Sequence, residues 1–417
     1  MSQSRNNIVI VGAGFGGLSA AKALAKAPVT ITLIDTQNHH LFQPLLYQVA
    51  TAALTPAEIA VPIRQILRNQ NNVTVVMDTV TRVDPDKQHV STEHGQSFDY
   101  DTLILATGAR HSYFGNDHWA GHAPGLKTLN DAAKLREKIL TSFEQAEILA
   151  HTDLQAAKAY QTFVVVGAGP TGVEMAGAIA ELSQSLMRDF RRLDPTDNQI
   201  ILLEGGDRVL PSFAPKLSDR AQRDLATLGV DVRTQTMVTN ISDTSVQTDQ
   251  GLIATHTTVW AAGVQASPAA KWLGVTADRG GHVPVDDTLR PEGFRNIYVI
   301  GDTAKHIAKG APLPGIAPVA KQMGQYVGRR LAQQAKGQSP SKSFAYKDAG
   351  ALATIGRNRA VADIFGLKVK GFLGWLLWGA AHVYFLIGYK NRLFVVLSWL
   401  WAYITWQRGV RLIMHRD

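Results

Sequence analysis

Hydrophobic and polar positions along the chain form a repeated pattern of strand, turn and helix. The apolar run NIVIV, residues 7–11, leads into the glycine turn GAGFGG and then into LSAAKALAKA, whose small and apolar residues suit a helix. A second apolar run, TITLID, follows and ends on Asp35. This alternation of apolar strands with a helical stretch predicts an α/β fold on a parallel sheet.

The same pattern occurs again in the middle of the chain. QTFVVVGAGPTGVEMAGAIAEL, residues 161–182, places a glycine turn between an apolar run and a helical one, and QIILLEGG ends its apolar run on Glu204. The sequence therefore predicts two Rossmann-like dinucleotide-binding domains.

Each glycine turn has the spacing that a pyrophosphate site needs. Gly12 allows the tight turn, Gly14 lets the backbone approach a pyrophosphate, and Gly17 lets the helix pack on the strand. The second turn repeats the spacing at Gly167, Gly169 and Gly172. The bare motif also occurs in ordinary turns, but a strand, a helix and an acid in this order favour dinucleotide binding.

The acids at the strand ends predict which nucleotides bind. Asp35 can accept from a ribose hydroxyl. Glu204 would bond the ribose 2′-OH and repel a 2′-phosphate, which favours NAD over NADP. The alternative is that Glu204 only caps a loop, and Arg208 lies close enough along the chain to suit a 2′-phosphate.

Two further strands end in recognisable turns. YDTLILATGAR and NIYVIGDTA each stop on a small or glycine turn, and VWAAGV (259–264) is a weaker relative of the first. They resemble the ATG and GD motifs of the two-dinucleotide-binding-domain flavoproteins. That resemblance implies FAD on the amino-terminal unit, NAD(P)H on the inserted unit, and a contact from Asp302 to the FAD ribityl or phosphate region. A simple helix cap is the alternative for Asp302.

Composition narrows the class of enzyme. The chain has 417 residues, of which 45% are hydrophobic, enough for two or three domains with cores. The polar lead Met1 to Asn7 predicts no signal peptide and no amino-terminal anchor. Because there is no cysteine, disulfide reductases and sulfide:quinone oxidoreductases, which use paired cysteines, are excluded. No metal-ligand spacing is present, so no metal is predicted.

The carboxy-terminal segment departs from this pattern. From Phe365 to Asp417 there are seven basic residues, one acid and five of the eight tryptophans. Residues 371–389 contain no acid, lysine or arginine, and a helix of that length would measure about 28 Å, near the thickness of the hydrocarbon core. Four glycines and His382 argue against spanning.

A helical wheel divides this stretch into two faces. One face carries Trp375, Trp378, His382, Phe385 and Tyr389, and the other carries Leu373, Leu376, Leu377, Ala380 and Ile387. We predict a monotopic anchor of one or two amphipathic helices on an anionic lipid surface. A buried dimer interface is the alternative.

Four segments resemble the type II NADH:quinone oxidoreductases, also called alternative NADH dehydrogenases. They are NHHLFQPLLYQVAT (38–51), LPGIAPVAKQMGQYVG (313–328), ATIGRNRAV (353–361) and the aromatic tail. The resemblance covers nearly the whole chain. It implies a respiratory enzyme that takes hydride from NADH onto one non-covalent FAD and passes two electrons to membrane ubiquinone or menaquinone, without proton pumping. It also implies a peripheral position on the cytoplasmic face of the inner or plasma membrane, with a homodimer left open.

The resemblance implies the site residues as well. Glu174 would lie near the nicotinamide and flavin, and Gln322 on the quinone side of the flavin; purely structural roles on their helices are the alternatives. FAD contacts are implied at Gly12, Gly14, Phe15, Gly16, Gly17, Asp35, Gln48, Val80, Ala106, Thr107, Gly108, Asp302 and Ala320. NADH contacts are implied at Gly167, Gly169, Pro170, Thr171, Gly172, Glu204, Ala262 and Gly263. Two departures from the family pattern, Pro318 for a glutamine and Ala178 for a second acid, leave the proton route to the quinone open.

The predicted architecture is an FAD-binding domain from residues 1–125 and 290–345, an NAD-binding domain from 126–289 and a membrane-anchoring region from 346–417. An alternative enzyme is a soluble FAD-dependent NADH reductase for a ferredoxin or rubredoxin partner, which would have no use for the apolar basic tail. A further alternative is a non-enzymatic flavoprotein whose redox state controls a partner. Nucleic acid is not predicted as a partner, because the basic residues flank apolar runs.

Overall fold

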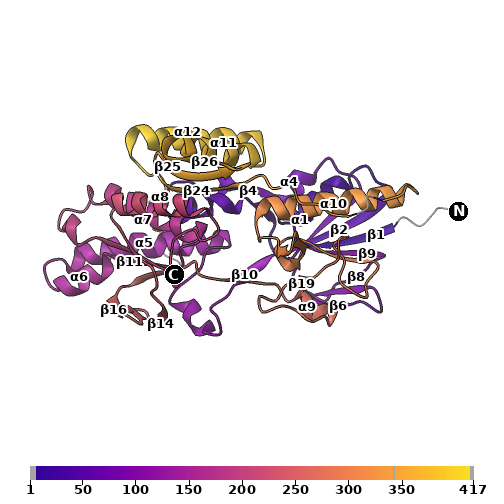
Figure 1. Cartoon of the computed structure of the whole chain (residues 1–417), viewed down its shortest axis with the longest axis horizontal. Coiled ribbons are helices and arrows are strands. Elements are labelled where there is room, and N and C mark those ends of the chain that lie inside the picture. The colour runs from indigo at the N-terminus through magenta and orange to yellow at the C-terminus, as the bar shows by residue number, and fades with distance from the viewer. Residues whose placement is uncertain (1–5, 341–342, 414–417) are drawn as a thin grey trace. The chain divides into compact units, whose positions relative to one another are not determined.

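The computed structural model describes residues 6–340 and 343–413, and the chain forms two compact units (Figure 1). The units comprise Met1–Leu41, Ala60–Arg110 and Val264–Asp348 in the first, and Phe42–Ile59, His111–Gly263 and Ala349–Asp417 in the second. Arg416 and Asp417, which the charge count of the tail includes, lie outside the described residues.

A five-stranded parallel sheet forms the centre of the first unit. Its order is β20-β9-β1-β2-β5, with bounds Asn6–Val11 for β1, Val29–Asp35 for β2, Val73–Met77 for β5, Thr102–Leu105 for β9 and Ile297–Val299 for β20. The predicted apolar runs supply its middle strands, where Ile8, Ile31 and Leu103 are almost fully buried. Strands buried on both faces are typical of parallel sheets that helices cover.

Two helices pack closely against each other in the first unit. They are α1 (Phe15–Ala23) and α10 (Ala317–Ala335) (Figure 1). A Cβ atom added at Gly324 would lie 2.1 Å from the carbonyl oxygen of Gly16, so the contact requires glycine. Pro318 occupies the first turn of α10, where the missing N–H costs nothing.

The second unit repeats this plan. Its four-stranded parallel sheet has the order β13-β12-β11-β17, with bounds Thr162–Val166 for β11, Gln199–Leu203 for β12, Val230–Arg233 for β13 and Thr257–Trp260 for β17. These strands correspond one by one to β5, β2, β1 and β9. The helices α7 (Pro170–Leu186) and α8 (Pro215–Thr227) follow β11 and β12 in the chain, and α5 (Leu129–Leu149) contacts β17.

Both units also carry an antiparallel three-stranded sheet at the same point in the repeat. In the first it is β6 (Val80–Asp84), β7 (His89–Thr92) and β8 (Ser97–Asp99), and in the second it is β14 (Val238–Ile241), β15 (Ser245–Thr248) and β16 (Gly251–Ala254). The recurrence confirms the prediction of two Rossmann-like units.

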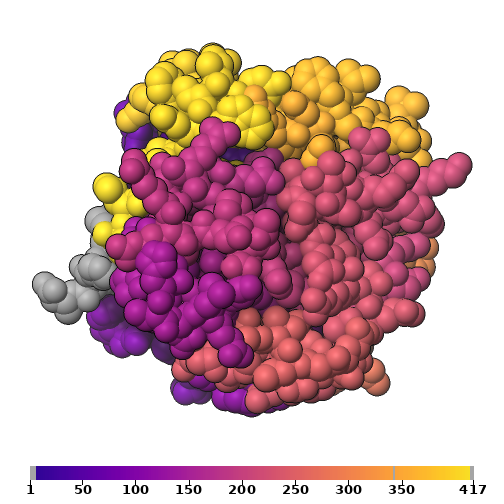
Figure 2. All heavy atoms as spheres, turned by 90° about the vertical axis from the view of Figure 1, so that its left-hand side faces the viewer, coloured from indigo at the N-terminus to yellow at the C-terminus, as the bar shows by residue number. Residues whose placement is uncertain are grey.

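The carboxy-terminal residues belong to the second unit. Strands β24 (Ala351–Gly356), β25 (Arg359–Ile364) and β26 (Leu367–Lys370) form an antiparallel sheet, followed by α11 (Gly371–Phe385) and α12 (Tyr389–Thr405). A Cβ atom at Gly177 of α7 would lie 1.8 Å from the carbonyl oxygen of Ile355, so α7 and β24 are in backbone contact. Figure 2 shows the carboxy-terminal residues in orange and yellow as a continuous layer along the top of the view.

Short elements complete the two units. Those of the first are β3 (His39–Leu41), β4 (Ala60–Pro62), α4 (Ile63–Leu67), β18 (Val264–Ala266), α9 (Ala269–Leu273), β19 (Val283–Pro284), η4 (Gly301–Thr303), β21 (Ala304–Lys305), β22 (Ile307–Ala308) and β23 (Ala311–Pro312). Those of the second are η1 (Gln43–Leu45), α2 (Leu46–Ala50), α3 (Pro56–Ile59), η2 (Asp117–Gly121), α6 (Leu154–Tyr160) and η3 (Pro195–Asp197), and β10 (Ala109–His111) crosses from one unit to the other along the chain.

The compact units differ from the predicted domain boundaries. Residues 42–59 group with the second unit, residues 264–289 group with the first, and the carboxy-terminal region is part of the second unit rather than a separate body. The reason is packing: β24 lies on α7, and α12 contacts α3, so these segments share one core.

The two faces predicted for the tail are both present on α11. Trp378 is 3% exposed, whereas Leu373 is 64% exposed, so the aromatic face turns inward and the leucine face outward. Phe385 and Tyr389 were grouped with the aromatic face but are exposed, because α11 ends at Phe385 and a new helix begins at Tyr389. Among the described residues, no helix combines the length and the hydropathy needed to cross a bilayer.

Candidate functional site

The first glycine turn has the geometry of a dinucleotide cradle. Gly12 has φ +98°, and a Cβ atom there would lie 2.3 Å from the carbonyl oxygen of Ala106. Among the described residues, apart from Gly14 itself and its two chain neighbours, nothing lies within 4 Å of a Cβ built at Gly14, and α1 begins directly after it without a side-chain cap. Free N–H groups at a helix start beside open space suit a pyrophosphate, so these residues fit FAD.

The second glycine turn repeats this geometry. Gly167 also has φ +98°, and a Cβ atom there would lie 2.5 Å from Cα of Ala262. In the described part of the chain, nothing but Gly169 itself and its two chain neighbours lies within 4 Å of a Cβ built at Gly169. Pro170 begins α7, where its fixed φ suits the first helical position. Ala262 therefore crowds Gly167 as Ala106 crowds Gly12. The second turn fits a second dinucleotide.

The two predicted acids make equivalent hydrogen bonds. Asp35 accepts from the amides of Ala13 at 2.6 Å and Gln37 at 2.7 Å. Glu204 accepts from the amides of Ala168 and Gly206, each at 2.7 Å. Each carboxylate oxygen has a second lone pair, so both acids can brace the glycine turn and still accept from a ribose hydroxyl.

Asp35 lies in a partly buried position beside the first glycine turn. Burial raises the pKa of its carboxyl above the ordinary value, and the hydrogen bonds from Ala13 and Gln37 oppose that shift. Because burial destabilises the ionised carboxylate of Asp35, a further hydrogen-bond donor would stabilise it, and a ribose hydroxyl would be such a donor.

Other predicted FAD residues of the first unit gather around the first turn. Gly16 lies against Ile300 and the carbonyl oxygen of Ala320, and a Cβ at Gly301 would lie 3.3 Å from Cβ of Ala320. Thr107 bonds Thr303 at 3.1 Å between hydroxyl oxygens. Gly108 has φ +69°, and Phe15, Gly17 and Asp302 lie in α1 or η4.

The other two predicted FAD residues belong to β6 and to α2. Val80 is a buried residue at the start of β6. Gln48 belongs to α2 in the second unit, where its side chain bonds two aromatic residues.

Gln322 uses both ends of its carboxamide within the first unit. Its Nε2 donates to the carbonyl oxygen of Lys347 at 2.9 Å, and its Oε1 accepts from the amide of Lys347 at 3.0 Å. This pairing is what a purely structural role requires, and the assignment of Gln322 to the quinone side remains a prediction.

The remaining predicted NADH residues line up along the second turn. Gly172 approaches the carbonyl oxygen of Gly167 so closely that a Cβ would lie 1.8 Å from it. Thr171 is exposed at the start of α7. A Cβ at Gly263 would meet the ring of Phe114 at 2.5 Å, so Phe114 covers the end of this motif.

A cavity of about 130 Å³ lies inside the second unit. Its lining comes from α2, α7, β24, α11, α12 and the segments that follow α2, β24 and α12. Its lining residues are Tyr47, Gln48, Ala53, Glu174, Ala178, Glu181, Thr354, Ile355, Gly356, Arg357, Trp375, Trp378, Trp399, Ala402, Tyr403, Trp406 and Arg408. Aromatic walls with a few convergent polar groups are typical of small-molecule sites.

One face of α7 brings three residues to this cavity. Glu174, Ala178 and Glu181 follow the i, i+4, i+7 spacing of a single helix face, and all three line the cavity. Ala178, where the family pattern has a second acid, therefore lines the cavity together with Glu174. This wall has one acid fewer than that pattern implies.

Glu174 is held in its neutral form at neutral pH. Burial raises the pKa of its carboxyl to about 8, opposed by the amide of Thr354 and by the Trp378 side chain. The Thr354 amide donates to Oε1 at 3.4 Å. A neutral carboxyl in an aromatic pocket can donate a hydrogen bond or a proton at pH 7.

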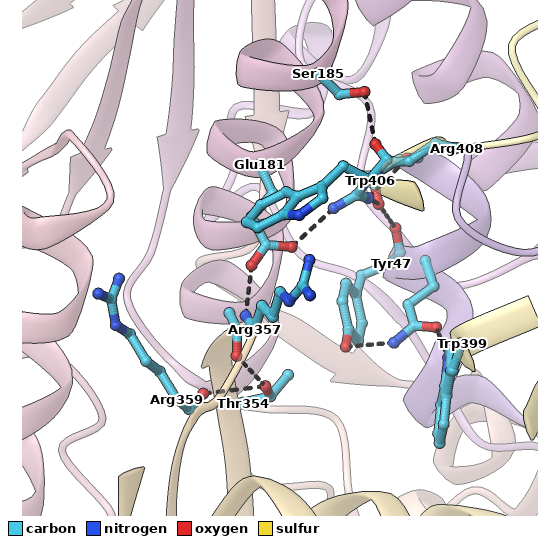
Figure 3. A network of polar contacts seen from close by, with 12 residues as sticks. Tyr47, Glu181, Ser185, Thr354, Arg357, Arg359, Trp399, Trp406 and Arg408 are labelled. Atoms are coloured by element: carbon cyan, nitrogen blue, oxygen red, sulfur yellow. Dashed lines mark hydrogen bonds and ion pairs between the residues drawn. The ribbon is translucent and has the colours of Figure 1, made fainter. Parts of the chain in front are cut away.

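Glu181 joins two arginines at one side of the cavity (Figure 3). Its Oε2 pairs with Nη2 of Arg408 at 2.9 Å, and its Oε1 accepts from the amide of Arg357. The Arg357 guanidinium lies 3.8 Å from the ring centroid of Tyr403 and 3.9 Å from that of Trp406. Two aromatic faces around one cation stabilise its charge without a carboxylate partner.

The segment after α12 returns across α7 and α2. The hydroxyl of Ser185 donates to the carbonyl oxygen of Trp406 at 3.1 Å, and Nη1 of Arg408 donates to the carbonyl oxygen of Thr51 at 3.0 Å. The amide of Val410 donates to the carbonyl oxygen of Ala52 at 3.3 Å. These bonds join parts of the cavity wall that are far apart in the sequence.

Sequence reasoning missed several of these lining residues. Glu181, Arg357, Trp399 and Arg408 were not predicted as site residues, because three of them lie in segments interpreted only as a lipid anchor or a family signature. The spacing of Glu174 and Glu181 on one helix face was the available signal, since two acids seven positions apart share a face.

This arrangement, with two glycine-turn units and an aromatic cavity, defines a flavin- and nicotinamide-dependent oxidoreductase. The family model for pyridine nucleotide-disulphide oxidoreductases matches residues 6–324, and that for the NDH2 C-terminal domain matches residues 349–406. The chain is 43% identical to the type II NADH:quinone oxidoreductase Ndh of Mycobacterium tuberculosis, over 97% of this chain and 89% of the relative. It is 42% identical to NdhA of the same organism, over 97% and 88%. The chain belongs to the type II NADH:quinone oxidoreductases.

A solved structure with a similar fold is that of NDH2 from Plasmodium falciparum in complex with NADH. It matches with a TM-score of 0.88 and 22% identity, over 99% of this chain and 100% of that one. The sulfide:quinone oxidoreductase of Aquifex aeolicus shares the fold at a TM-score of 0.73 and 19% identity, although this chain has no cysteine.

Family membership confirms the function predicted from the sequence. The protein is an FAD-dependent enzyme that oxidises NADH and reduces quinone without pumping protons, and it associates peripherally with the membrane. Bound FAD supplies the redox chemistry of hydride acceptance and electron transfer.

Proposed function

We propose that the ring of a membrane quinone, ubiquinone or menaquinone, is reduced in the cavity of the second unit. The observation that supports this proposal is the lining of the cavity, which combines aromatic side chains with the hydroxyl of Tyr47 and the neutral carboxyl of Glu174. Several of the lining residues belong to α11 and α12. An apolar cavity of about 150 Å³ holds a benzene ring, so the volume of about 130 Å³ is of the right order for a quinone ring.

The two dinucleotides are assigned to the two glycine turns. FAD binds at Gly12, Gly14 and Asp35 of the first unit, and NADH binds at Gly167, Gly169 and Glu204 of the second. The open space at Gly14 and Gly169 supports this assignment. Glu204 selects NADH over NADPH, because its carboxylate accepts from a 2′-OH and repels a 2′-phosphate.

Glu174 is assigned as a group that exchanges a proton at the cavity. Its raised pKa supports a role as hydrogen-bond or proton donor at neutral pH. Gln322 is assigned to the quinone side of the flavin. In the structure both ends of its carboxamide are bonded to the backbone of Lys347, so this role requires those two hydrogen bonds to break.

The outer faces of α11 and α12 are proposed to lie on a lipid surface at the cytoplasmic side of the membrane. Leu373, Leu376, Leu393, Leu397 and Leu400 are between 46% and 64% exposed there. Lys368, Lys370 and Lys390 are exposed beside them. Apolar side chains flanked by positive charge suit the anionic cytoplasmic leaflet.

Filling the cavity tests the placement of the quinone. Ala402 lies on α12 in the cavity wall, and Ala402→Phe would occupy space there. We expect stopped-flow measurements to show normal flavin reduction by NADH and at least tenfold slower reoxidation by a short-chain quinone. Reoxidation at the wild-type rate in the folded variant would refute the placement.

A further inference from the structure

Trp399 of α12 is linked through Gln48 to Tyr47 in the cavity wall. Nε1 of Trp399 donates to Oε1 of Gln48 at 2.7 Å, and Nε2 of Gln48 donates to the hydroxyl oxygen of Tyr47 at 2.8 Å. Figure 3 shows this chain of bonds between the two labelled aromatic residues. Trp399 and Gln48 are 351 positions apart, so only the folded unit creates the link.

The chemistry of the three groups fixes the direction of every bond. An indole N–H can only donate, so the atom of Gln48 that faces Trp399 must be the carboxamide oxygen. The carboxamide nitrogen is therefore the atom that faces Tyr47, and it can only donate. The hydroxyl of Tyr47 must accept, and its own proton points away from Gln48.

The proton of Tyr47 is available to a molecule in the cavity. Within residues 6–340 and 343–413, no group accepts a hydrogen bond from this hydroxyl, and Tyr47 lines the cavity. Burial raises the pKa of Tyr47 well above its ordinary value, and Glu174, whose carboxyl is charged only above about pH 8, adds to this rise. The hydroxyl therefore stays protonated at neutral pH and keeps its capacity to donate.

We propose that Trp399 is a positioning residue for quinone reduction: by fixing the Gln48 carboxamide it leaves Tyr47 as a hydrogen-bond donor to a quinone carbonyl. The inference rests on the proposed placement of the quinone in this cavity. A donor aimed at the carbonyl stabilises the negative charge that develops on oxygen when electrons arrive. Trp399, which sets this donor, lies on α12, and the same helix carries the exposed leucines Leu393, Leu397 and Leu400.

Three substitutions interrupt the series of hydrogen bonds from Trp399 to Tyr47 at different points. Trp399→Phe keeps an aromatic ring but removes the donor, so the carboxamide of Gln48 can turn and accept the Tyr47 proton. Gln48→Glu keeps the bond to Trp399 and, when its carboxyl is ionised, presents only acceptors, so that Tyr47 must donate to it. Tyr47→Phe removes the hydroxyl itself.

Stopped flow separates the two half-reactions of each variant. In Trp399→Phe and Tyr47→Phe we expect flavin reduction by NADH to stay within about twofold of wild type, and in all three variants we expect reoxidation by a short-chain ubiquinone analogue to slow by about tenfold or more. The double variant Trp399→Phe/Tyr47→Phe should be no slower than Tyr47→Phe alone, because both changes remove the same hydrogen bond.

Trp401→Phe is the matched control. Trp401 lies on the same helix, is 61% exposed and does not line the cavity. We expect wild-type rates in both half-reactions, whereas a general effect of losing a tryptophan from α12 would appear in Trp401→Phe as well.

The outcomes distinguish this inference from the proposed placement. If Ala402→Phe blocks reoxidation while Trp399→Phe reoxidises at the wild-type rate, the quinone site stands and the role of Trp399 is refuted. Additive losses in the double variant, or equal slowing of both half-reactions by Trp399→Phe, would also overturn it. If Ala402→Phe has no effect, the placement itself fails.

Discussion

Nη2 of Arg408 lies 2.9 Å from Oε2 of Glu181, and the two side chains are only 11% and 20% exposed. The same guanidinium donates to the carbonyl oxygen and hydroxyl of Thr51 at 3.0 and 3.1 Å. One cation thus ties the segment after α12 to α7 and to the end of α2. These are three of the segments that form the cavity.

Breaking this ion pair should destabilise the protein strongly. In Arg408→Met, the carboxylate of Glu181 stays in the cavity wall with only the amide of Arg357 as a partner, and an uncompensated buried charge costs about 3–5 kcal/mol. We expect a decrease of that size in the free energy of unfolding, measured by denaturant titration.

The ion pair of Arg411 with Asp189 is the matched control. It joins the same segment to the protein, but its side chains are 33% and 55% exposed. Arg411→Met should therefore cost only about 0–1 kcal/mol. Equal losses in the two variants would mean that the segment, rather than the buried charge, carries the stability.

Glu174 should make stability depend on pH. The folded protein holds its proton to about pH 8, whereas the ordinary value is 4.5. Between these two pH values the folded state therefore binds more protons than the unfolded state. The contribution of Glu174 to the free energy of unfolding is fully present below pH 4.5 and is lost as pH rises through about 8.

Glu174→Gln removes this titration and tests its sign. We expect the melting temperature of wild type to fall, relative to that of the variant, as pH rises from 6 to about 9. Glu144→Gln, at an exposed position of α5, should leave the wild-type pH profile unchanged. A constant difference between wild type and Glu174→Gln across this range would show that Glu174 is not held neutral.

The glycine turns could be predicted from sequence because their requirements are local. Gly12 and Gly167 have the same positive φ and the same crowding by a neighbouring strand end, and only glycine meets both conditions. The spacing of strand, turn, helix and acid is likewise contained in one short stretch of chain.

The cavity could not be predicted because its bonds join distant parts of the sequence. Arg408 and Glu181 are 227 positions apart, and no local pattern marks either one as the partner of the other. The sequence predicted two faces on the tail but assigned both to a lipid anchor, since leucine and tryptophan in one helix are compatible with both lipid and a protein core. The structure divides them, with Trp378 and Trp399 lining the cavity and the leucines outside.

Glu204 should determine nucleotide selectivity. Glu204→Gln keeps the size of the side chain but removes its charge, so we expect kcat/KM for NADH to fall by roughly tenfold or more, as for loss of a hydrogen bond to a charged group. The NADH/NADPH ratio of kcat/KM should fall as well, while bound FAD is retained. A wild-type enzyme that uses both nucleotides equally would contradict this assignment.

Gln322 should affect only quinone reduction if its assignment is correct. Gln322→Ala would then leave flavin reduction by NADH near normal and slow reoxidation by quinone. If its bonds to Lys347 are its whole role, the variant should lose stability, by about 1–3 kcal/mol, with both half-reactions unchanged. Impaired flavin reduction would contradict both assignments.

The exposed leucines of α12 should hold the enzyme on lipid. Leu393, Leu397 and Leu400 share one helix face and are 58%, 49% and 52% exposed. Removing residues 371–417 would also remove Trp399 and Arg408 from the cavity, so substitution at the surface is the sharper experiment. We expect the triple change to serine to leave the protein in the supernatant when vesicles containing phosphatidylglycerol are sedimented, with activity towards a short-chain quinone retained.

Salt separates the two contributions to this binding. Wild type should remain on the vesicles at high ionic strength, because burial of three leucines is worth several kcal/mol at about 25 cal/mol per Å² and is not screened. Leu154→Ser/Leu252→Ser, at two leucines 57% and 66% exposed elsewhere, should sediment like wild type. If the α12 variant still sediments, the leucine face does not dock on lipid. If it instead turns a dimer into a monomer in the absence of vesicles, that face is a contact between two copies of the chain.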